Sequence, residues 1–178
     1  MALAYDVLER GLWALPAPPR DAGTVALVVV RPETEQRETP ERARLTLEGG
    51  VEGDRWGKRE GRKLKNQITL MRVDVARLFA DGQPLSLFGD NLLVELDLST
   101  GNLPAGTRLW IGTALCEVTP EPHTGCGKFA ARFGADARAL TLAPEYVEDH
   151  LRGIHVFVVE PGEVGPGDGV RVVSRPLG

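Results

Sequence analysis

Apolar residues along this chain gather in short runs, and several runs show the alternation that is typical of β-strands. Residues 91–98 alternate most clearly, with Leu92, Val94, Leu96 and Leu98 on one side and Asn91, Glu95 and Asp97 on the other. Other runs are rich in β-branched residues, which favour buried strands. The runs that predict strands are 24–31, 42–48, 67–73, 91–98, 107–111, 114–118, 154–159 and 170–173.

Helical patterns are fewer and shorter. Residues 2–13 have apolar positions at helical spacing and are followed by prolines, so they predict an amphipathic helix that caps the domain. Short helices are also expected at 74–80, at 146–150 and within 128–142, where Gly134 interrupts the pattern. We therefore divide the chain into an N-terminal helical extension, 1–20, and a single domain, 21–178.

The spacing of these elements predicts the fold class. About eight short strands alternate with Gly- and Pro-rich turns such as 161–169, and no long helix follows each strand, which disfavours a parallel doubly wound sheet. Residues Gly112 and Thr113 separate two strands and indicate a hairpin. We expect a mainly β protein: a closed or nearly closed β-barrel, mixed or antiparallel, with a few short helices.

Composition narrows the class only slightly. The chain is 42% hydrophobic and 26% charged with a net charge of -4, which is ordinary for a globular protein and gives no general case for nucleic-acid or membrane binding. Two cysteines make no disulfide framework, and neither a signal peptide nor an apolar run long enough to span a bilayer is visible. The expected location is the cytoplasm.

The chemically richest stretch is the loop that holds Cys126. Cys126 lies between Gly125 and Gly127, so neither neighbour has a side chain to shield the thiol, and His123 and Lys128 lie close by in sequence. A nearby cation would favour the thiolate. We interpret Cys126 as a reactive or ligating cysteine, with burial in the loop as the alternative.

The neighbours of Cys126 have open roles. His123 is either a proton donor to the site or a surface histidine, and Lys128 either lowers the thiol pKa, binds phosphate or is solvated. Cys116 lies in the middle of a predicted strand and is interpreted as core packing; a disulfide to Cys126 is disfavoured in a reducing compartment.

A second candidate site is a glycine-rich loop followed by a basic segment. Residues 49–57 contain four glycines, and residues 55–65 carry six basic residues and one acid, in a chain whose sum is negative. Exposed backbone N–H groups beside arginine and lysine suit a phosphate, although a solvated charged loop is the plainer interpretation.

Six further polar residues are candidates for ligand binding. Arg55 directly follows the glycine turn, and Asp54 is expected to orient it or to cap a turn. Gln67 and Thr69 share one face of a strand and either line a pocket or face solvent. The other candidates are Asn91 at a strand start and Arg152 before Gly153.

Several of these stretches, taken in order, resemble the MOSC domain, which is named for the C-terminal part of molybdenum cofactor sulfurases. The resemblance covers roughly residues 22–175. The motifs that carry it are 49–55, 67–70, 88–94, 103–112, 126–128, 152–153 and 160–168.

The resemblance implies a β-barrel whose pocket accommodates molybdenum cofactor (molybdopterin). It implies that Cys126 carries sulfur or ligates molybdenum, and that a pterin phosphate would suit the basic segment 55–65. Possible activities are sulfur transfer and reduction of N-hydroxylated substrates, with a sulfur donor or an electron-transfer protein as partner. The chain departs from the family pattern at Trp56 and around Cys126, and it has no room for a pyridoxal-phosphate desulfurase domain. A non-catalytic module that binds or carries an anionic ligand remains the alternative, while a nucleic-acid binder is disfavoured by the acidic remainder of the chain.

Overall fold

The computed structural model describes residues 2–177 and has a seven-stranded closed barrel as its framework. The strands follow one another around the barrel in the order β1-β10-β6-β7-β8-β4-β5. Neighbours pair antiparallel except β4 and β5, which are parallel, so the barrel is mixed. The strands are β1 (Ala22–Val28), β4 (Ile68–Arg72), β5 (Leu92–Glu95), β6 (Arg108–Ile111), β7 (Ala114–Val118), β8 (Ile154–Glu160) and β10 (Gly169–Ser174).

A small second sheet lies beside the barrel. It has the order β3-β2-β9, with β2 (Ala43–Thr46), β3 (Gly50–Val51) and β9 (Gly162–Val164). The segment 161–169 was expected to be only a turn, but its first part pairs with β2. The strand predicted at 42–48 is shorter than expected: it ends at Thr46, whose Oγ1 accepts a hydrogen bond from the Gly49 N–H, and Leu47 is exposed.

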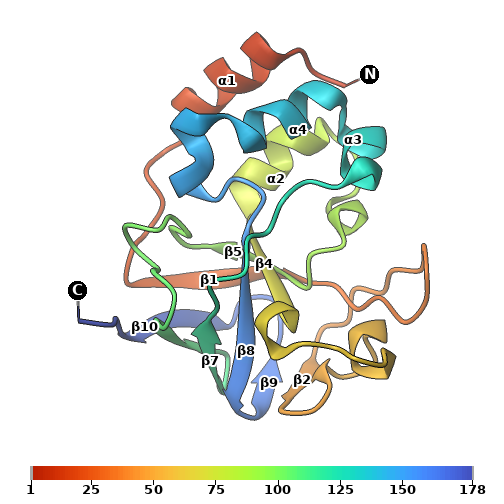
Figure 1. Ribbon diagram of the computed structural model, residues 1–178, viewed down its shortest axis with the longest axis vertical. Coiled ribbons are helices and arrows are strands. Elements are labelled where there is room, and N and C mark those ends of the chain that lie inside the picture. Colours follow the sequence, from red (N-terminus) through yellow and green to blue (C-terminus); the bar gives the residue numbers. More distant parts are fainter. Residues whose placement is uncertain (1, 178) are drawn as a thin grey trace.

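Helices gather at one end of the barrel (Figure 1). They are α1 (Tyr5–Ala14), α2 (Val73–Ala80), α3 (Gly127–Phe133) and α4 (Ala135–Leu142). The predicted interruption at Gly134 is confirmed, because this glycine has a φ of 101° and separates α3 from α4. Short 3-10 helices lie at Arg55–Lys58, Leu64–Asn66, Leu85–Phe88 and Pro144–Asp149.

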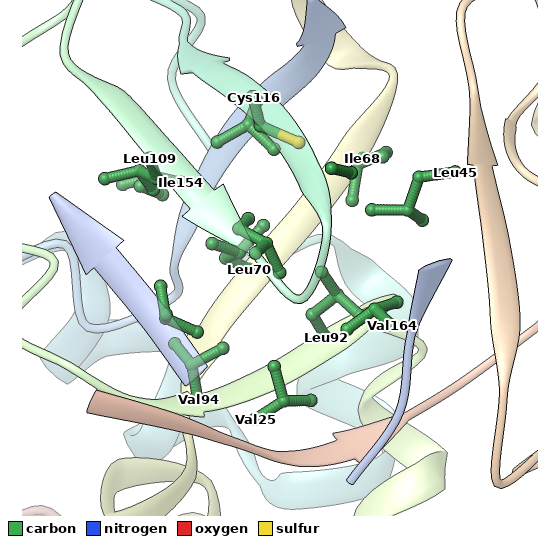
Figure 2. Packing of buried hydrophobic residues seen from close by; sticks show 14 of the residues in the cluster. Val25, Leu45, Ile68, Leu70, Leu92, Val94, Leu109, Cys116, Ile154 and Val164 are labelled. Atoms are coloured by element: carbon green, nitrogen blue, oxygen red, sulfur yellow. The ribbon is translucent and has the colours of Figure 1, made fainter. Parts of the chain in front are cut away.

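Two apolar clusters hold these layers together. The first fills the barrel, and Leu70 and Leu92 belong to it (Figure 2). The second lies between the barrel wall and the helices, and Met71 and Leu93 belong to that one. Because successive residues of a strand point to opposite faces, β4 and β5 contribute to both clusters in turn. The predicted face of residues 91–98 is confirmed, since all four of its apolar members lie in the barrel cluster.

Candidate functional site

Cys126 lies at the start of α3, at the end of a loop that leaves β7 and runs up to the helices (Figure 1). The residue is exposed. A Cβ built at Gly127 would meet no atom within 4 Å, so the space beside the thiol is open on that side. At Gly125 a Cβ would lie 3.0 Å from the ring of Phe129, so this second glycine serves packing rather than access.

The surroundings of Cys126 favour its thiolate. Partial burial raises the pKa of the thiol, but the backbone N–H groups of Phe129 and Lys128 and the charge of Arg152 outweigh burial, and the net pKa is lowered. Cys116 is the opposite case: it is fully buried in the barrel, and burial raises the pKa of its thiol to about 12. Both cysteines are free.

The Cys126 thiol opens into a cavity of about 230 Å³ with a strongly basic lining. We call this cavity the basic pocket. Its charged lining residues come from five parts of the chain: the loop after β1, the glycine loop, the turn before β5, α3 and the segment just before β8. The cationic members are Arg31, Arg37, Arg55, Lys128, Arg132 and Arg152, and the acidic member is Asp90.

Unpartnered polar atoms concentrate in this pocket. Among the side chains of residues 2–177, five buried nitrogen or oxygen atoms have no hydrogen-bond partner, and all five belong to residues that line the basic pocket. Buried polar atoms are normally paired, so a group of unpaired polar atoms in one cavity indicates a place where a ligand belongs. The atoms are Arg37 Nε, Arg55 Nε, Arg152 Nε, His123 Nδ1 and Asp90 Oδ1.

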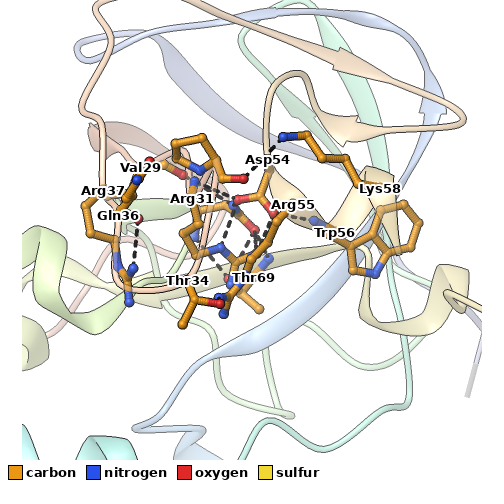
Figure 3. Close-up of polar contacts among 12 residues, drawn as sticks. Val29, Arg31, Thr34, Gln36, Arg37, Asp54, Arg55, Trp56, Lys58 and Thr69 are labelled. Carbon is orange, nitrogen blue, oxygen red and sulfur yellow. Dashed lines mark hydrogen bonds and ion pairs between the residues drawn. The ribbon is translucent and has the colours of Figure 1, made fainter. Parts of the chain in front are cut away.

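Arg31 is fixed at the wall of the pocket by a buried network (Figure 3). Its Nε donates to Asp54 Oδ2 at 2.8 Å and a terminal nitrogen donates to Oδ1 at 3.0 Å. Asn91 Nδ2 donates to the same carboxylate at 3.0 Å. Burial opposes ionisation of Asp54, but Arg31 lowers its pKa overall. Asp54 was expected to orient Arg55 or to cap a turn. Its carboxylate caps the turn at Arg55–Lys58, where Oδ1 accepts from the Trp56 N–H at 2.9 Å, but the arginine that it orients is Arg31 and not Arg55.

A second buried cluster lies at the base of the pocket. Arg152 donates to Asp90 at 2.5 Å, and its guanidinium lies 5.1 Å from the ring centroid of Phe129. His123 Nδ1 is 3.5 Å from Asp90 Oδ1, too far for a strong hydrogen bond. Burial, followed by the charge of Arg152, lowers the pKa of His123 well below its ordinary value, so the imidazole is neutral near pH 7.

A glycine makes this base possible. Gly153 has a φ of 106°, and a Cβ there would lie 2.0 Å from the backbone oxygen of Leu70 and 3.3 Å from His123 Nδ1. The glycine therefore lets the start of β8 approach β4 and leaves room for the imidazole.

Six of the nine residues selected from sequence line the basic pocket: Cys126, His123, Lys128, Arg55, Thr69 and Arg152. Asp54 and Asn91 lie behind it and position Arg31. Gln67 lies away from the pocket, where its amide donates to the Leu47 carbonyl and accepts from the Val158 N–H.

Of the basic segment 55–65, only Arg55 lines the basic pocket. Lys58 pairs with Glu33 and Lys65 pairs with Glu121, both on the surface. Arg59, Arg62 and Lys63 are exposed and do not line the basic pocket. The cations that do line it come instead from segments that are far apart in sequence.

Sequence reasoning missed four charged residues of the pocket: Arg31, Arg37, Asp90 and Arg132. Arg31 is the last residue of the predicted strand 24–31, and Asp90 precedes Asn91 in a turn. Both are polar residues at predicted strand ends, and this signal could have identified them from the sequence. Arg37 and Arg132 carry no such signal, because a loop and a helix face bring them to the pocket.

Among residues 2–177, no three histidine, cysteine, aspartate or glutamate side chains gather as a metal site. None of the helices in that range is long and apolar enough to cross a membrane.

A small mixed β-barrel with a thiol at the mouth of an arginine-lined cavity defines a class of protein suited to hold an anionic, thiophilic ligand. The family model of the MOSC domain matches residues 73–171, more than half of the chain, so the chain belongs to the MOSC domain family. That family is associated in general with molybdenum cofactor binding.

Solved structures support the same fold. The YUAD protein of Bacillus subtilis is similar with a TM-score of 0.63 at 16% identity, over 90% of this chain and 100% of that one. YiiM of Escherichia coli is similar with a TM-score of 0.57 at 22% identity, over 86% of this chain and 71% of that one. At these identities the likeness concerns the fold. A search of curated proteins finds no match to this sequence.

Proposed function

We propose that this protein binds molybdenum cofactor, or a closely related anionic pterin, in the basic pocket, with Cys126 as the group that ligates the metal or accepts sulfur. The observation that carries the proposal is the coincidence of a thiol of lowered pKa with three buried, unpartnered arginine nitrogens in one cavity. A soft thiolate suits molybdenum or sulfur, and arginines suit a phosphate.

The electrostatics of the pocket favour an anion. Burial, followed by the charge of Arg132, lowers the pKa of the Arg37 guanidinium. Such crowding of cations has a cost in the empty pocket, which a bound phosphate would relieve. Arg37, Arg55 and Arg152 each have a free Nε donor, so these three would hold the anionic part of the cofactor.

When bound, the cofactor would supply the redox-active or sulfur-handling metal centre. The chain itself would hold Cys126 as a thiolate, neutralise the phosphate charge, and keep a neutral imidazole, His123, near Asp90. A neutral imidazole can accept or donate one proton, which sulfur transfer and reductive chemistry both require. We propose these two reaction classes, sulfur transfer and reduction of N-hydroxylated compounds, with a sulfur donor or electron-transfer protein as partner and a reducing compartment such as the cytoplasm as location.

The test is metal and cofactor analysis of protein produced in a host that makes molybdenum cofactor. We expect near-stoichiometric molybdenum in the native sequence, loss of molybdenum in Cys126→Ser, and reduced loading in Arg55→Gln. Arg59→Gln is the matched control, because Arg59 is an exposed arginine of the same segment outside the basic pocket.

Absence of both molybdenum and pterin from the native protein would reject the proposal. Pterin or phosphate that stays bound in Cys126→Ser without any metal would favour the second candidate, a non-catalytic carrier of an anionic ligand. Intact-mass measurement adds a direct view of sulfur chemistry, since a persulfide adds one sulfur atom to Cys126.

A further inference from the structure

A second cavity of about 350 Å³ lies on the other side of the wall that closes the basic pocket. We call it the apolar cavity. Its lining consists of Thr100 and residues 103–105, 118–124, 141–142, 147–148 and 150–154. Its volume falls within the range of roughly 300–1,000 Å³ that is usual for small-molecule sites.

The lining of this cavity is mainly apolar, and part of it is exposed. Leu103 and Val118 form buried parts of the wall. Leu142 and Val147 also line it, and they are 42% and 52% exposed. An apolar ligand that covers these side chains would be stabilised by roughly 25 cal/mol for each Å² of apolar surface removed from water.

The charges of the apolar cavity differ from those of the basic pocket. In the described part of the chain, 2–177, no lysine lines the apolar cavity, and its arginine, Arg152, is paired with Asp90. Glu121 and Glu148 are the acidic lining residues, and Glu121 is paired with Lys65. Both ring nitrogens of His150 have a hydrogen-bond partner: Nε2 lies near Thr100 Oγ1, and Nδ1 lies near the Leu98 carbonyl oxygen. The charge of Arg152 is balanced by Asp90, and the two glutamates give the rest of the lining a negative balance, so a neutral molecule would enter with the smallest cost in desolvation and charge repulsion.

The two cavities share part of their lining. His123, Thr124 and Arg152 line both. His123 Nδ1 is buried toward Asp90 without a partner. Within residues 2–177 its Nε2 makes no hydrogen bond and is not among the buried unpartnered atoms, so the atom keeps some access to solvent or a ligand. The histidine thus offers one accessible ring nitrogen at the boundary between the two spaces.

We propose that the apolar cavity binds a neutral organic molecule with an apolar body and a single hydrogen-bonding group, and that this group meets His123 at the boundary with the basic pocket. The cavity is then the substrate site for chemistry at Cys126. That role as a substrate site depends on the function proposed above, whereas binding of the neutral molecule does not.

The test uses benzamide, a neutral aromatic amide, as the probe of the apolar cavity, and inorganic phosphate as the probe of the basic pocket. Saturation-transfer NMR and backbone amide shifts report benzamide binding. We expect saturation transfer to benzamide in the native protein, with the largest shifts in residues 103–105 and 142–152. Absence of saturation transfer would overturn the proposal, and so would shifts centred on Arg31 and Arg37.

Ala105→Trp is the blocking variant, because Ala105 is an exposed loop alanine that lines the cavity. It should weaken benzamide binding about tenfold or more and leave phosphate binding unchanged. Ala17→Trp is the matched control, since Ala17 is another exposed loop alanine that follows a proline, and it should change neither. Equal benzamide affinity in Ala105→Trp and Ala17→Trp would overturn the proposal.

A third variant separates the two proposals. Arg55→Gln should weaken phosphate binding without changing benzamide binding, because Arg55 lines only the basic pocket. If phosphate fails to bind the native protein while benzamide binds at residues 103–105, the function proposed for the basic pocket is wrong, and the proposal that the apolar cavity binds a neutral molecule is supported. Val147→Arg, at the exposed rim, should also weaken benzamide binding, and it replaces Ala105→Trp as the blocking variant if Ala105→Trp is poorly folded.

Discussion

Cys126 differs from Cys116 in solvent exposure and in the pKa of its thiol, and this difference between two residues can be measured directly. Because the pKa of Cys126 is lowered, its thiolate forms at lower pH than an ordinary cysteine, whose pKa is about 8.5. We therefore expect the rate of its alkylation by iodoacetamide, measured by mass spectrometry, to reach half its maximum at a lower pH than the rate for N-acetylcysteine amide. Cys116 should stay unmodified in the folded protein.

Cys126→Ser is the control for this measurement, since it should remove the fast labelling entirely. A midpoint at or above that of the free amino-acid derivative would contradict the assigned environment of the thiol.

The buried Asp90–Arg152 pair gives a second residue-scale prediction. Asp90→Ala leaves the Arg152 guanidinium buried without its carboxylate, so we expect a loss of about 3–5 kcal/mol in the free energy of unfolding. Asp6→Ala removes a carboxylate from an exposed pair with Arg10 and should cost less than about 0.5 kcal/mol. Urea titration measures both, and equal losses would mean that the Asp90 pair is not buried in solution.

At the residue scale, the sequence located the exposed cysteine of the basic pocket better than it located the charged residues around it. Cys126 was recognisable because its glycines and basic neighbour are local in the chain. Arg37 and Arg132 were not, since each reaches the pocket only through the path of a loop or the rotation of a helix. Asp54 was selected but assigned to the wrong arginine, because sequence proximity favoured Arg55 over the distant Arg31.

At the scale of elements, the loop after β1 is tied to α3 by one acidic residue. Glu35 accepts from Lys128 at 2.6 Å and also pairs with Arg132, and it has a φ of 63°. A left-handed conformation costs a non-glycine residue roughly 1–2 kcal/mol, so these contacts hold the loop against strain. The same loop carries Arg37 to the basic pocket.

Glu35→Gln should therefore loosen residues 33–38 and weaken phosphate binding. The hydrogen bonds from Lys128 and Arg132 lower the pKa of Glu35 to about 2, so the contribution of this contact is complete above about pH 4.5 and is lost as the pH falls toward 2. Hydrogen exchange of the loop measures the effect. Glu33→Gln removes the same charge from the same loop, and similar exchange rates in the two variants would contradict a special role for Glu35.

The elements themselves were mostly predictable, because both faces of the central strands are buried and the turns are marked by glycine and proline. The short strands β3 and β9 were not. Gly50–Val51 and Gly162–Val164 lie in glycine-rich segments and pair only because the fold brings β2 beside them. Local sequence contains no signal for such pairing.

At the scale of the whole molecule, α1 helps to cover the cluster on which the cysteine helix rests. Leu8 is 1% exposed in that cluster, together with Phe129 and Phe133 of α3. Leu8→Ala should cost about 2–5 kcal/mol in unfolding free energy, measured by thermal or urea denaturation. Val7→Ala, at a neighbouring position that is 39% exposed, should cost far less; equal costs would show that α1 is not packed on the domain.

The closed barrel has a consequence for how the chain folds as it is synthesised. Strand β1 pairs with β5 and with β10, so residues 22–24 meet residues 169–171. Until β10 leaves the ribosome, β1 and β6 each have an edge with unpaired backbone groups. Closure is therefore a late, long-range step, and nascent chains that are stalled before residue 169 should be the species that chaperones bind and proteases remove.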